Sequence, residues 1–156
     1  MLGTAIRLCR EIFIRPFEGY HKRLPDGSCQ AYPDPATKGP PWTIGYGTTG
    51  PDVRPGTVWT HDYAALRCDQ HLMEFALGLI ELSPGLVDAT PRQFSALLSW
   101  AYNCGLRNYR ISTLRKRVDE RDWDSAAREM LKWDKAAGKR MKGLTRRRQA
   151  ESAMLK

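Results

Sequence analysis

Long apolar runs are missing from this sequence. None approaches the ~20 residues that a helix needs to cross a bilayer, and charged residues such as Arg7, Arg10 and Glu11 interrupt the N-terminal segment. We therefore expect no signal peptide, no transmembrane segment and no stable membrane insertion. A chain of this kind that acts outside the cytoplasm depends on another agent for its release.

Metal-binding and nucleotide-binding strings are also missing. There is no HExxH string and no glycine-rich phosphate loop, and the cysteines form no CxxC pair. A zinc site is therefore not expected, and no cofactor, metal or organic, is predicted. The cysteines are expected to be reduced and buried, with disulfides as the alternative in an oxidising compartment. They are Cys9, Cys29, Cys68 and Cys104.

The composition is that of an ordinary globular chain with an excess of positive charge. The 156 residues are 42% hydrophobic and 27% charged, so one domain spanning 1–156 can bury a core. The formal charge of +8 suits an anionic partner such as nucleic acid, anionic lipid or the bacterial cell wall. Charge alone does not choose among these partners, and solubility is an equally good explanation of it.

The N-terminal segment has the pattern of an amphipathic helix. Apolar side chains recur at helical spacing over residues 2–13, with arginines between them. Pro16 lacks an amide donor and is expected to kink or end this helix. Gly19 suits the left-handed residue that follows a helix. Glu18 is therefore expected at or just past the helix end, where the negative end of the dipole disfavours ionisation of a carboxyl group.

The next segment changes character. Residues 20–59 hold seven of the ten prolines, which predicts a small β lobe of turns with short extended pieces at Gln30–Tyr32 and Trp42–Tyr46. Thr60 can cap a helix that runs to about Leu82 and joins this lobe to a helical lobe at about 83–156. The predicted fold class is therefore α+β.

The helical lobe has a strong start signal. Thr90 supplies a capping side chain, and it is followed by a proline and, three residues on, by Gln93. This pattern predicts a helix that ends at Gly105. Shorter helices are expected at about 112–120, 123–136 and 144–154.

Three residues in the first part of the chain are candidates for hydrolytic chemistry. Glycoside hydrolysis needs a protonated carboxyl group and a second carboxylate that activates water or acts as nucleophile. Glu18 suits the first role, and Asp34, held between two prolines, suits the second. The Thr43 hydroxyl could hold a water. Taken one at a time, Asp34 is as well explained as a turn residue and Thr43 as an ordinary strand residue.

Taken together, these residues resemble the active-site signature of the phage lysozymes, glycoside hydrolase family 24, which includes the T-even phage type and related endolysins. The resemblance continues through the C-terminal half, so it covers nearly the whole chain in order. The strings that carry it are Phe17-Glu18-Gly19, Ala31-Tyr32-Pro33-Asp34, Trp42-Thr43-Ile44-Gly45-Tyr46-Gly47, Gln93-Phe94-Ser95-Ala96-Leu97, Ala101-Tyr102-Asn103-Cys104-Gly105, Ser112-Thr113-Leu114, Gly143-Leu144 and Arg146-Arg147-Arg148 with Glu151.

The resemblance implies a lysozyme-like fold and a catalytic triad of Glu18, Asp34 and Thr43. Glu18 would be the general acid, and the other two would position and activate water. The bond cut would be the β-1,4 bond between N-acetylmuramic acid and N-acetylglucosamine of peptidoglycan, with inversion, which needs about 6.5–9.5 Å between the carboxyl groups. The resemblance also implies sugar-binding roles for a further set of residues, which are Tyr46, Thr49, Tyr102, Asn103 and Thr113.

The sequence departs from the family pattern in two places. The stretch His21–Gln30 is an insert relative to the shortest relatives, and it contains a rival carboxylate, Asp26. Many relatives have histidine at the position of Thr48. The insert therefore offers a second carboxylate for the role assigned to Asp34.

The resemblance further implies a place and partners. The protein would be a monomeric endolysin that stays in the host bacterial cytoplasm until a holin releases it to the periplasm and cell wall, where it lyses the host. Its partner would be the glycan strands of peptidoglycan and not nucleic acid.

Other functions fit parts of the sequence. A lytic transglycosylase also uses a glutamate but leaves an anhydro sugar. A non-catalytic basic module could bind the cell wall or nucleic acid, since a fold does not fix a function. The presence of Glu18, Asp34 and Thr43 favours the hydrolase, and no zinc-finger or RNP-like string supports nucleic acid binding.

Overall fold

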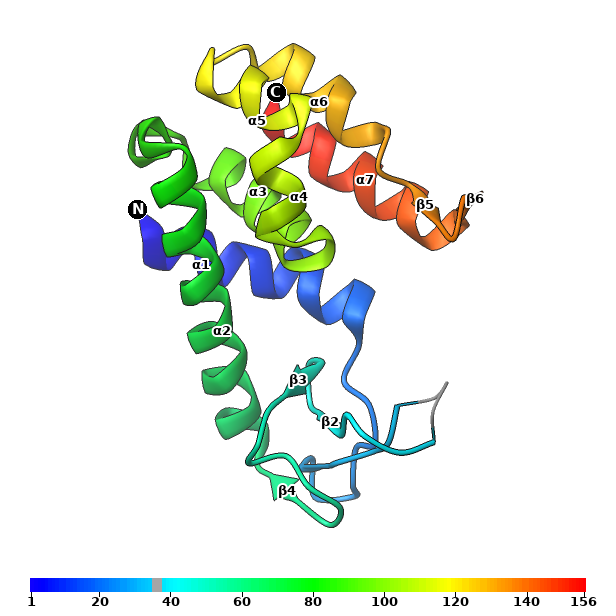
Figure 1. The fold of residues 1–156 in the computed structure, drawn as a ribbon. Helices are drawn as coiled ribbons and strands as arrows, with labels where there is room; N and C mark the ends of the chain where they lie inside the picture. The colour runs from blue at the N-terminus through cyan, green and yellow to red at the C-terminus, as the bar shows by residue number, and fades with distance from the viewer. Residues whose placement is uncertain (35–37) are drawn as a thin grey trace. The chain divides into compact units, whose positions relative to one another are not determined.

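The computed structural model describes residues 1–34 and 38–156, and the chain divides into two compact units. One unit is Ile14–His71, and the other combines Met1–Phe13 with Leu72–Lys156. Both are visible in Figure 1. The first is called the β unit here and the second the helical unit. That they act as one catalytic domain stays a prediction.

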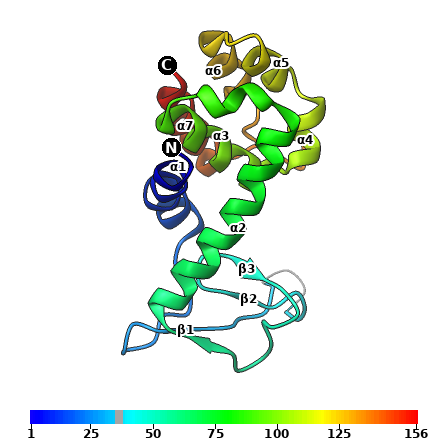
Figure 2. The same ribbon diagram turned by 90° about the vertical axis from the view of Figure 1, so that its left-hand side faces the viewer.

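The helical unit is built around a buried helix, α3 (Pro91–Cys104). Every residue from Phe94 to Ala101 is buried, because its neighbours surround it: α1 (Leu2–Cys9) and α7 (Lys142–Leu155) both pack on α3. Figure 1 and Figure 2 show this arrangement from two sides. The rest of the unit comprises η2 (Pro84–Asp88), α4 (Leu106–Ile111), α5 (Thr113–Asp119) and α6 (Trp123–Leu131).

Local side chains fix the ends of these helices. Thr90 and Gln93 form the predicted capping box at the start of α3, and Gly105, with a φ of 89°, follows its end. Ser112 accepts a hydrogen bond from the amide of Arg115 at the start of α5, and Asp122 does the same for Ser125 in α6. Each cap satisfies an amide that has no partner within the helix.

A buried ionic cluster joins α3 to α7. Glu151 is fully buried and accepts hydrogen bonds from the Ser99 hydroxyl at 2.5 Å, from Arg147 Nε at 3.1 Å and from Arg148 Nη2 at 2.9 Å. Arg147 also donates to the Ser99 carbonyl oxygen at 3.2 Å. Two guanidinium groups beside one carboxylate offset the cost of burying these charges, so the C-terminal helix is held to the core by polar contacts as well as apolar ones.

Two predictions for the helical unit were wrong in detail. The helix expected at 123–136 ends at Leu131, because the following residues form the hairpin of β5 (Lys135–Ala136) and β6 (Lys139–Arg140). Gly138 at φ 76° makes the tight turn of that hairpin. Helix α4 was not expected, because its six residues are too few to show a helical period.

The N-terminal helical segment changes type along its length. Beyond α1 the chain continues as a π-helix, η1 (Arg10–Glu18), which contains Pro16. The predicted helix end near Pro16 is confirmed, because η1 ends two residues later at Glu18. A π-helix is wider than an α-helix and pairs residues five apart, which relieves the clash of a proline ring with the carbonyl four residues earlier. The end falls at Gly19, whose φ of 78° confirms the predicted left-handed stop.

The β unit contains two short antiparallel pairs. β1 (Cys29–Gln30) pairs with β4 (Val58–Trp59), and β2 (Thr43–Ile44) pairs with β3 (Thr48–Thr49). An isolated bridge joins Tyr32 to Thr43. The extended pieces expected at 30–32 and 42–46 are therefore confirmed, though each is shorter than predicted.

Helix α2 (His61–Leu82) begins in the β unit and ends in the helical unit. Its start is confirmed, since Thr60 Oγ1 accepts a hydrogen bond from the Tyr63 amide at 3.2 Å. Among the described residues, no helix combines the length and apolar character that crossing a bilayer requires. Cys9, Cys29 and Cys68 are buried, and Cys104 is half-buried.

Candidate active site

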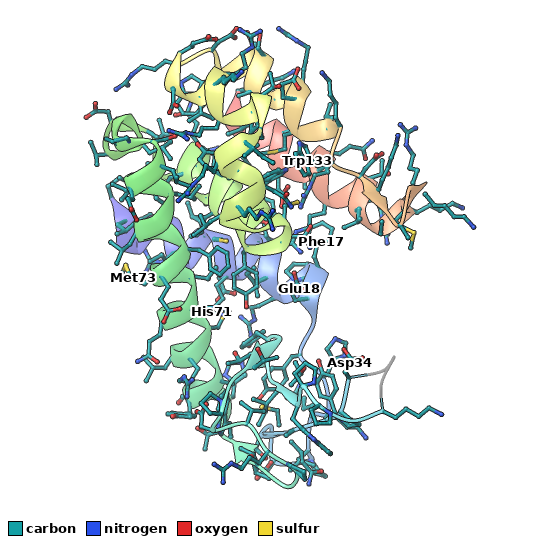
Figure 3. All side chains as sticks on the ribbon, viewed as in Figure 1. Phe17, Glu18, Asp34, His71, Met73 and Trp133 are labelled. Carbon is teal, nitrogen blue, oxygen red and sulfur yellow. The ribbon has the colours of Figure 1, made fainter. Side chains whose placement is uncertain are left out.

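Glu18 lies at the last position of η1, where Figure 3 shows it next to Phe17. It is half-buried. The chain leaves the helix through Gly19 in the left-handed region, and His21 Nε2 lies 2.7 Å from the Glu18 carbonyl oxygen. A helix end has carbonyl groups without intrahelical partners, so His21 satisfies one of them. The backbone at Glu18 is therefore held in place by this hydrogen bond and by the turn at Gly19.

Thr43 lies at the centre of a three-residue backbone ladder. Tyr32 and Thr43 exchange two hydrogen bonds, each 2.9 Å from amide nitrogen to carbonyl oxygen. On its other side Thr43 pairs in register with Thr49. Residues directly opposite each other in antiparallel strands place their side chains on the same face. The side chains of Tyr32, Thr43 and Thr49 therefore share one face of the β unit.

Asp34 follows two residues after Tyr32 and is half-buried. Its amide donates to the Gly39 carbonyl oxygen at 3.0 Å, and its own carbonyl accepts from the Lys38 amide at 2.8 Å. These backbone bonds hold Asp34 beside the strand that carries Thr43. Figure 3 shows Asp34 and Glu18 in the same unit.

Tyr32 connects Glu18 to the ladder electrostatically. Burial raises the pKa of Tyr32, and the negative charge of Glu18 raises it further. Tyr32, which is bonded to Thr43 and lies two residues before Asp34, therefore responds to the charge of Glu18.

Tyr46 lies in the interior of the β unit. Its side chain is only 2% exposed, and its hydroxyl lies 2.9 Å from His61 Nε2. Arg15 Nη2 lies 3.3 Å from the same nitrogen. Arginine can only donate, so His61 Nε2 accepts and carries no proton. Tyr20 packs on Tyr46 with ring centroids 5.0 Å apart. Tyr46 is therefore placed as a packing residue. Its side chain has almost no exposed surface with which to make the sugar contact that the resemblance implied.

Asp26, the rival carboxylate of the insert, has a local role. Its Oδ1 accepts from the Ser28 amide at 2.9 Å and from the Ser28 hydroxyl at 2.5 Å. These hydrogen bonds lower the pKa of Asp26, which suits a turn residue and not a proton donor.

The other predicted binding residues lie in the helical unit, except Thr49. Tyr102 is half-buried on α3, with its ring 5.3 Å from that of Phe75. Asn103 is exposed and lines a cavity of about 460 Å³. Thr113 is exposed at the first position of α5. The remaining lining residues of the cavity are Cys104, Asn108, Trp133, Lys135, Ala136 and Leu144.

Two residues near Glu18 were not selected from the sequence. Tyr32 belongs to one of the strings that resemble the family. It lies two residues before Asp34 on a predicted extended piece, and this spacing could have indicated that the two side chains share a face. His21 gave no such signal, because its contact with Glu18 depends on the turn at Gly19.

Comparisons with known proteins show the family of this chain. The sequence profile of the family described as phage lysozyme matches residues 18–151. The endolysin of Bacillus phage B103 is 40% identical over 113 residues, which cover 72% of this chain and 42% of that protein. The SAR-endolysin of bacteriophage PS119 is 34% identical over 110 residues, covering 70% and 64%.

A solved structure shares the fold. The endolysin from Escherichia coli O157:H7 phage FAHEc1 superposes with a TM-score of 0.74 at 26% identity, covering 97% of this chain and 90% of that one. The stretch that this chain matches is about half to two thirds of the length of the two sequence relatives. The lysozyme-like α+β fold expected from the sequence is confirmed, and the chain belongs to the phage lysozyme family.

Proposed function

We propose that this protein is a muramidase-type endolysin that hydrolyses the β-1,4 bond between N-acetylmuramic acid and N-acetylglucosamine in peptidoglycan. The observation that carries the proposal is the Tyr32–Thr43 bridge, because the Tyr32 ring contacts His21, which is hydrogen-bonded to the Glu18 carbonyl. Glu18, Asp34 and Thr43 belong to the same compact unit. Relatives named as endolysins support the same activity.

Glu18 acts as the general acid. In its protonated form it gives a proton to the glycosidic oxygen, so the N-acetylglucosamine leaves as a free 4-hydroxyl. It is half-buried at the last position of η1. After the step Glu18 is a carboxylate and must regain a proton from solvent.

Asp34 and Thr43 act on the water. The Asp34 carboxylate takes a proton from the water as its oxygen attacks the anomeric carbon, and the Thr43 hydroxyl positions that water. The products are a reducing N-acetylmuramic acid end and a non-reducing N-acetylglucosamine end. Attack by water from the face opposite the leaving group gives inversion.

Substrate contacts are proposed for the exposed predicted residues. Thr49 shares its face with Thr43 and can contact the sugar beside the attacking water. Tyr102, Asn103 and Thr113 are proposed to contact the N-acetyl sugars from the helical unit, where amide and aromatic side chains suit such ligands.

The proposed place of action is the host cell wall. The protein would act on peptidoglycan as a monomer after release from the cytoplasm, with a holin as the releasing partner. Release by holin would be checked by the timing of lysis with and without a co-expressed holin.

The test is a digest of purified peptidoglycan analysed by mass spectrometry. Wild type is expected to release reducing muropeptides, and Glu18→Gln is expected to release none. Asp26→Asn is the matched control, because it neutralises a carboxylate of the same unit outside the proposed site, and it should retain activity. Anhydro-muropeptides would instead indicate a lytic transglycosylase. Equal activity of wild type and Glu18→Gln would refute the role of Glu18.

A further inference from the structure

His21 contacts the residue proposed as general acid, and it does so through the backbone. The 2.7 Å distance joins His21 Nε2 to the Glu18 carbonyl oxygen. A carbonyl oxygen can only accept, so Nε2 carries the proton and donates it. This holds in both the neutral and the protonated states of the ring.

The path of the chain at Gly19 brings the ring into place. Gly19 has a φ of 78°, and a Cβ atom at this position would lie 3.0 Å from His21 Nε2 and 3.2 Å from its Cε1. The imidazole therefore lies directly over the glycine backbone. Only a residue without a side chain allows both the turn and this close approach.

The other side of the imidazole contacts the ladder. The rings of His21 and Tyr32 meet edge to face, with centroids 5.6 Å apart and an angle of 68° between planes. Tyr32 is bonded through its backbone to Thr43 in both directions. His21 is therefore one side chain that touches both the end of η1 and the strand pair that carries the other proposed catalytic groups.

We propose that His21 is a positioning residue, which holds the Glu18 carboxyl group at a fixed place relative to Asp34 and Thr43 through its hydrogen bond to the Glu18 carbonyl and its contact with the Tyr32 ring. This inference rests on the proposed function. It concerns a residue of the insert, outside the matched active-site strings. His21 is exposed and its partners belong to the site, so its contribution is expected in catalysis more than in stability.

Two substitutions separate the hydrogen bond from the ring contact. His21→Phe keeps an aromatic edge against Tyr32 but has no donor, whereas His21→Gln keeps a donor on a side chain of similar reach. We expect His21→Phe to lower kcat about tenfold with KM changed less than about twofold, because misplacing a catalytic group affects the reacting step. His21→Gln should recover most of the lost kcat.

The assay measures release of reducing ends from purified peptidoglycan, with thermal unfolding recorded for each variant. Lys22→Ala is the matched control, since Lys22 is the exposed neighbour in the same turn, and its kcat should equal that of wild type. An inactive wild type would refute the proposed function itself. An active wild type with unchanged kcat in His21→Phe would overturn the positioning role. Equal losses in His21→Phe and His21→Gln, with lowered unfolding temperatures, would also overturn it.

Discussion

At the scale of single residues, most of the buried polar groups discussed above have hydrogen-bond partners. The Tyr46 side chain is 2% exposed, and its hydroxyl lies 2.9 Å from Nε2 of the exposed His61. Glu151 has three donors around it in the helical unit. A buried polar group without a hydrogen-bond partner lowers the stability of the folded state. Replacing such a group with an apolar one of the same shape should therefore raise the free energy of unfolding.

Thr48 carries such a group. Its side chain is 3% exposed, and its hydroxyl has no hydrogen-bond partner among the described residues. Thr48→Val keeps the shape and removes the hydroxyl, so we expect the free energy of unfolding to rise by about 1 kcal/mol. Urea denaturation followed by circular dichroism measures it.

The control for this substitution is Thr49→Val. Thr49 is the adjacent strand residue and is exposed, so its stability should change by less than about 0.5 kcal/mol. Destabilisation by Thr48→Val would mean that its hydroxyl has a partner in solution, such as a buried water.

At the scale of elements, helix starts and stops were predicted correctly where a few neighbouring residues determine them. The caps at Thr60 and Thr90 and the stop at Gly19 each depend on residues within one turn. The π-helical course of η1 through Pro16 and the exposed hairpin of β5 and β6 were not revealed by the sequence pattern.

An ion pair joins α2 to the loop before β4, and it predicts a pH effect. Arg67 of α2 donates to the Asp52 carboxylate, and this bond lowers the pKa of Asp52 below its usual 3.8. A lowered folded-state pKa stabilises the fold above the unfolded-state pKa, and this stability is lost as the pH falls through the folded-state value.

Asp52→Asn should therefore reduce the loss of stability below about pH 4, without removing the contributions of other carboxylates. Unfolding temperatures from pH 2 to pH 7 measure this, with the exposed Asp124→Asn as control. If Asp52→Asn and wild type lose stability in parallel over that range, the ion pair has no role in solution. Because both groups are partly exposed, the effect is expected to be small.

At the scale of the whole molecule, positive charge is concentrated as well as abundant. The net charge is +8. The hairpin of β5 and β6 and the start of α7 expose cations, whereas Asp134, the acid beside them, is 3% exposed and pairs with Arg140 at 2.8 Å. The exposed cations are Lys135, Lys139, Arg140, Lys142 and Arg146.

We expect this basic surface to speed association with the anionic cell wall. Activity on intact walls should fall as salt rises from 0.05 to about 0.5 M, because salt screens such attraction. Lys139→Glu with Lys142→Glu should weaken both the activity at low salt and its dependence on salt. Turbidity loss of a wall suspension measures both.

A control pair separates local charge from net charge. Arg110→Glu with Lys116→Glu changes the net charge by the same amount at exposed positions of α4 and α5. It should have the smaller effect. If both pairs reduce activity equally, the net charge and not the basic surface is responsible.

The sequence by itself determined the fold class, the family and the main helix boundaries. It did so because apolar periodicity, caps and the short strings around Glu18, Asp34 and Thr43 are local patterns. Only the tertiary structure decided that Tyr46 is buried against His61, that Asp26 serves a turn, and that His21 and Tyr32 stand between Glu18 and Thr43. These contacts join residues whose chain segments meet through the register of short strands, and that register is not encoded in residue spacing alone.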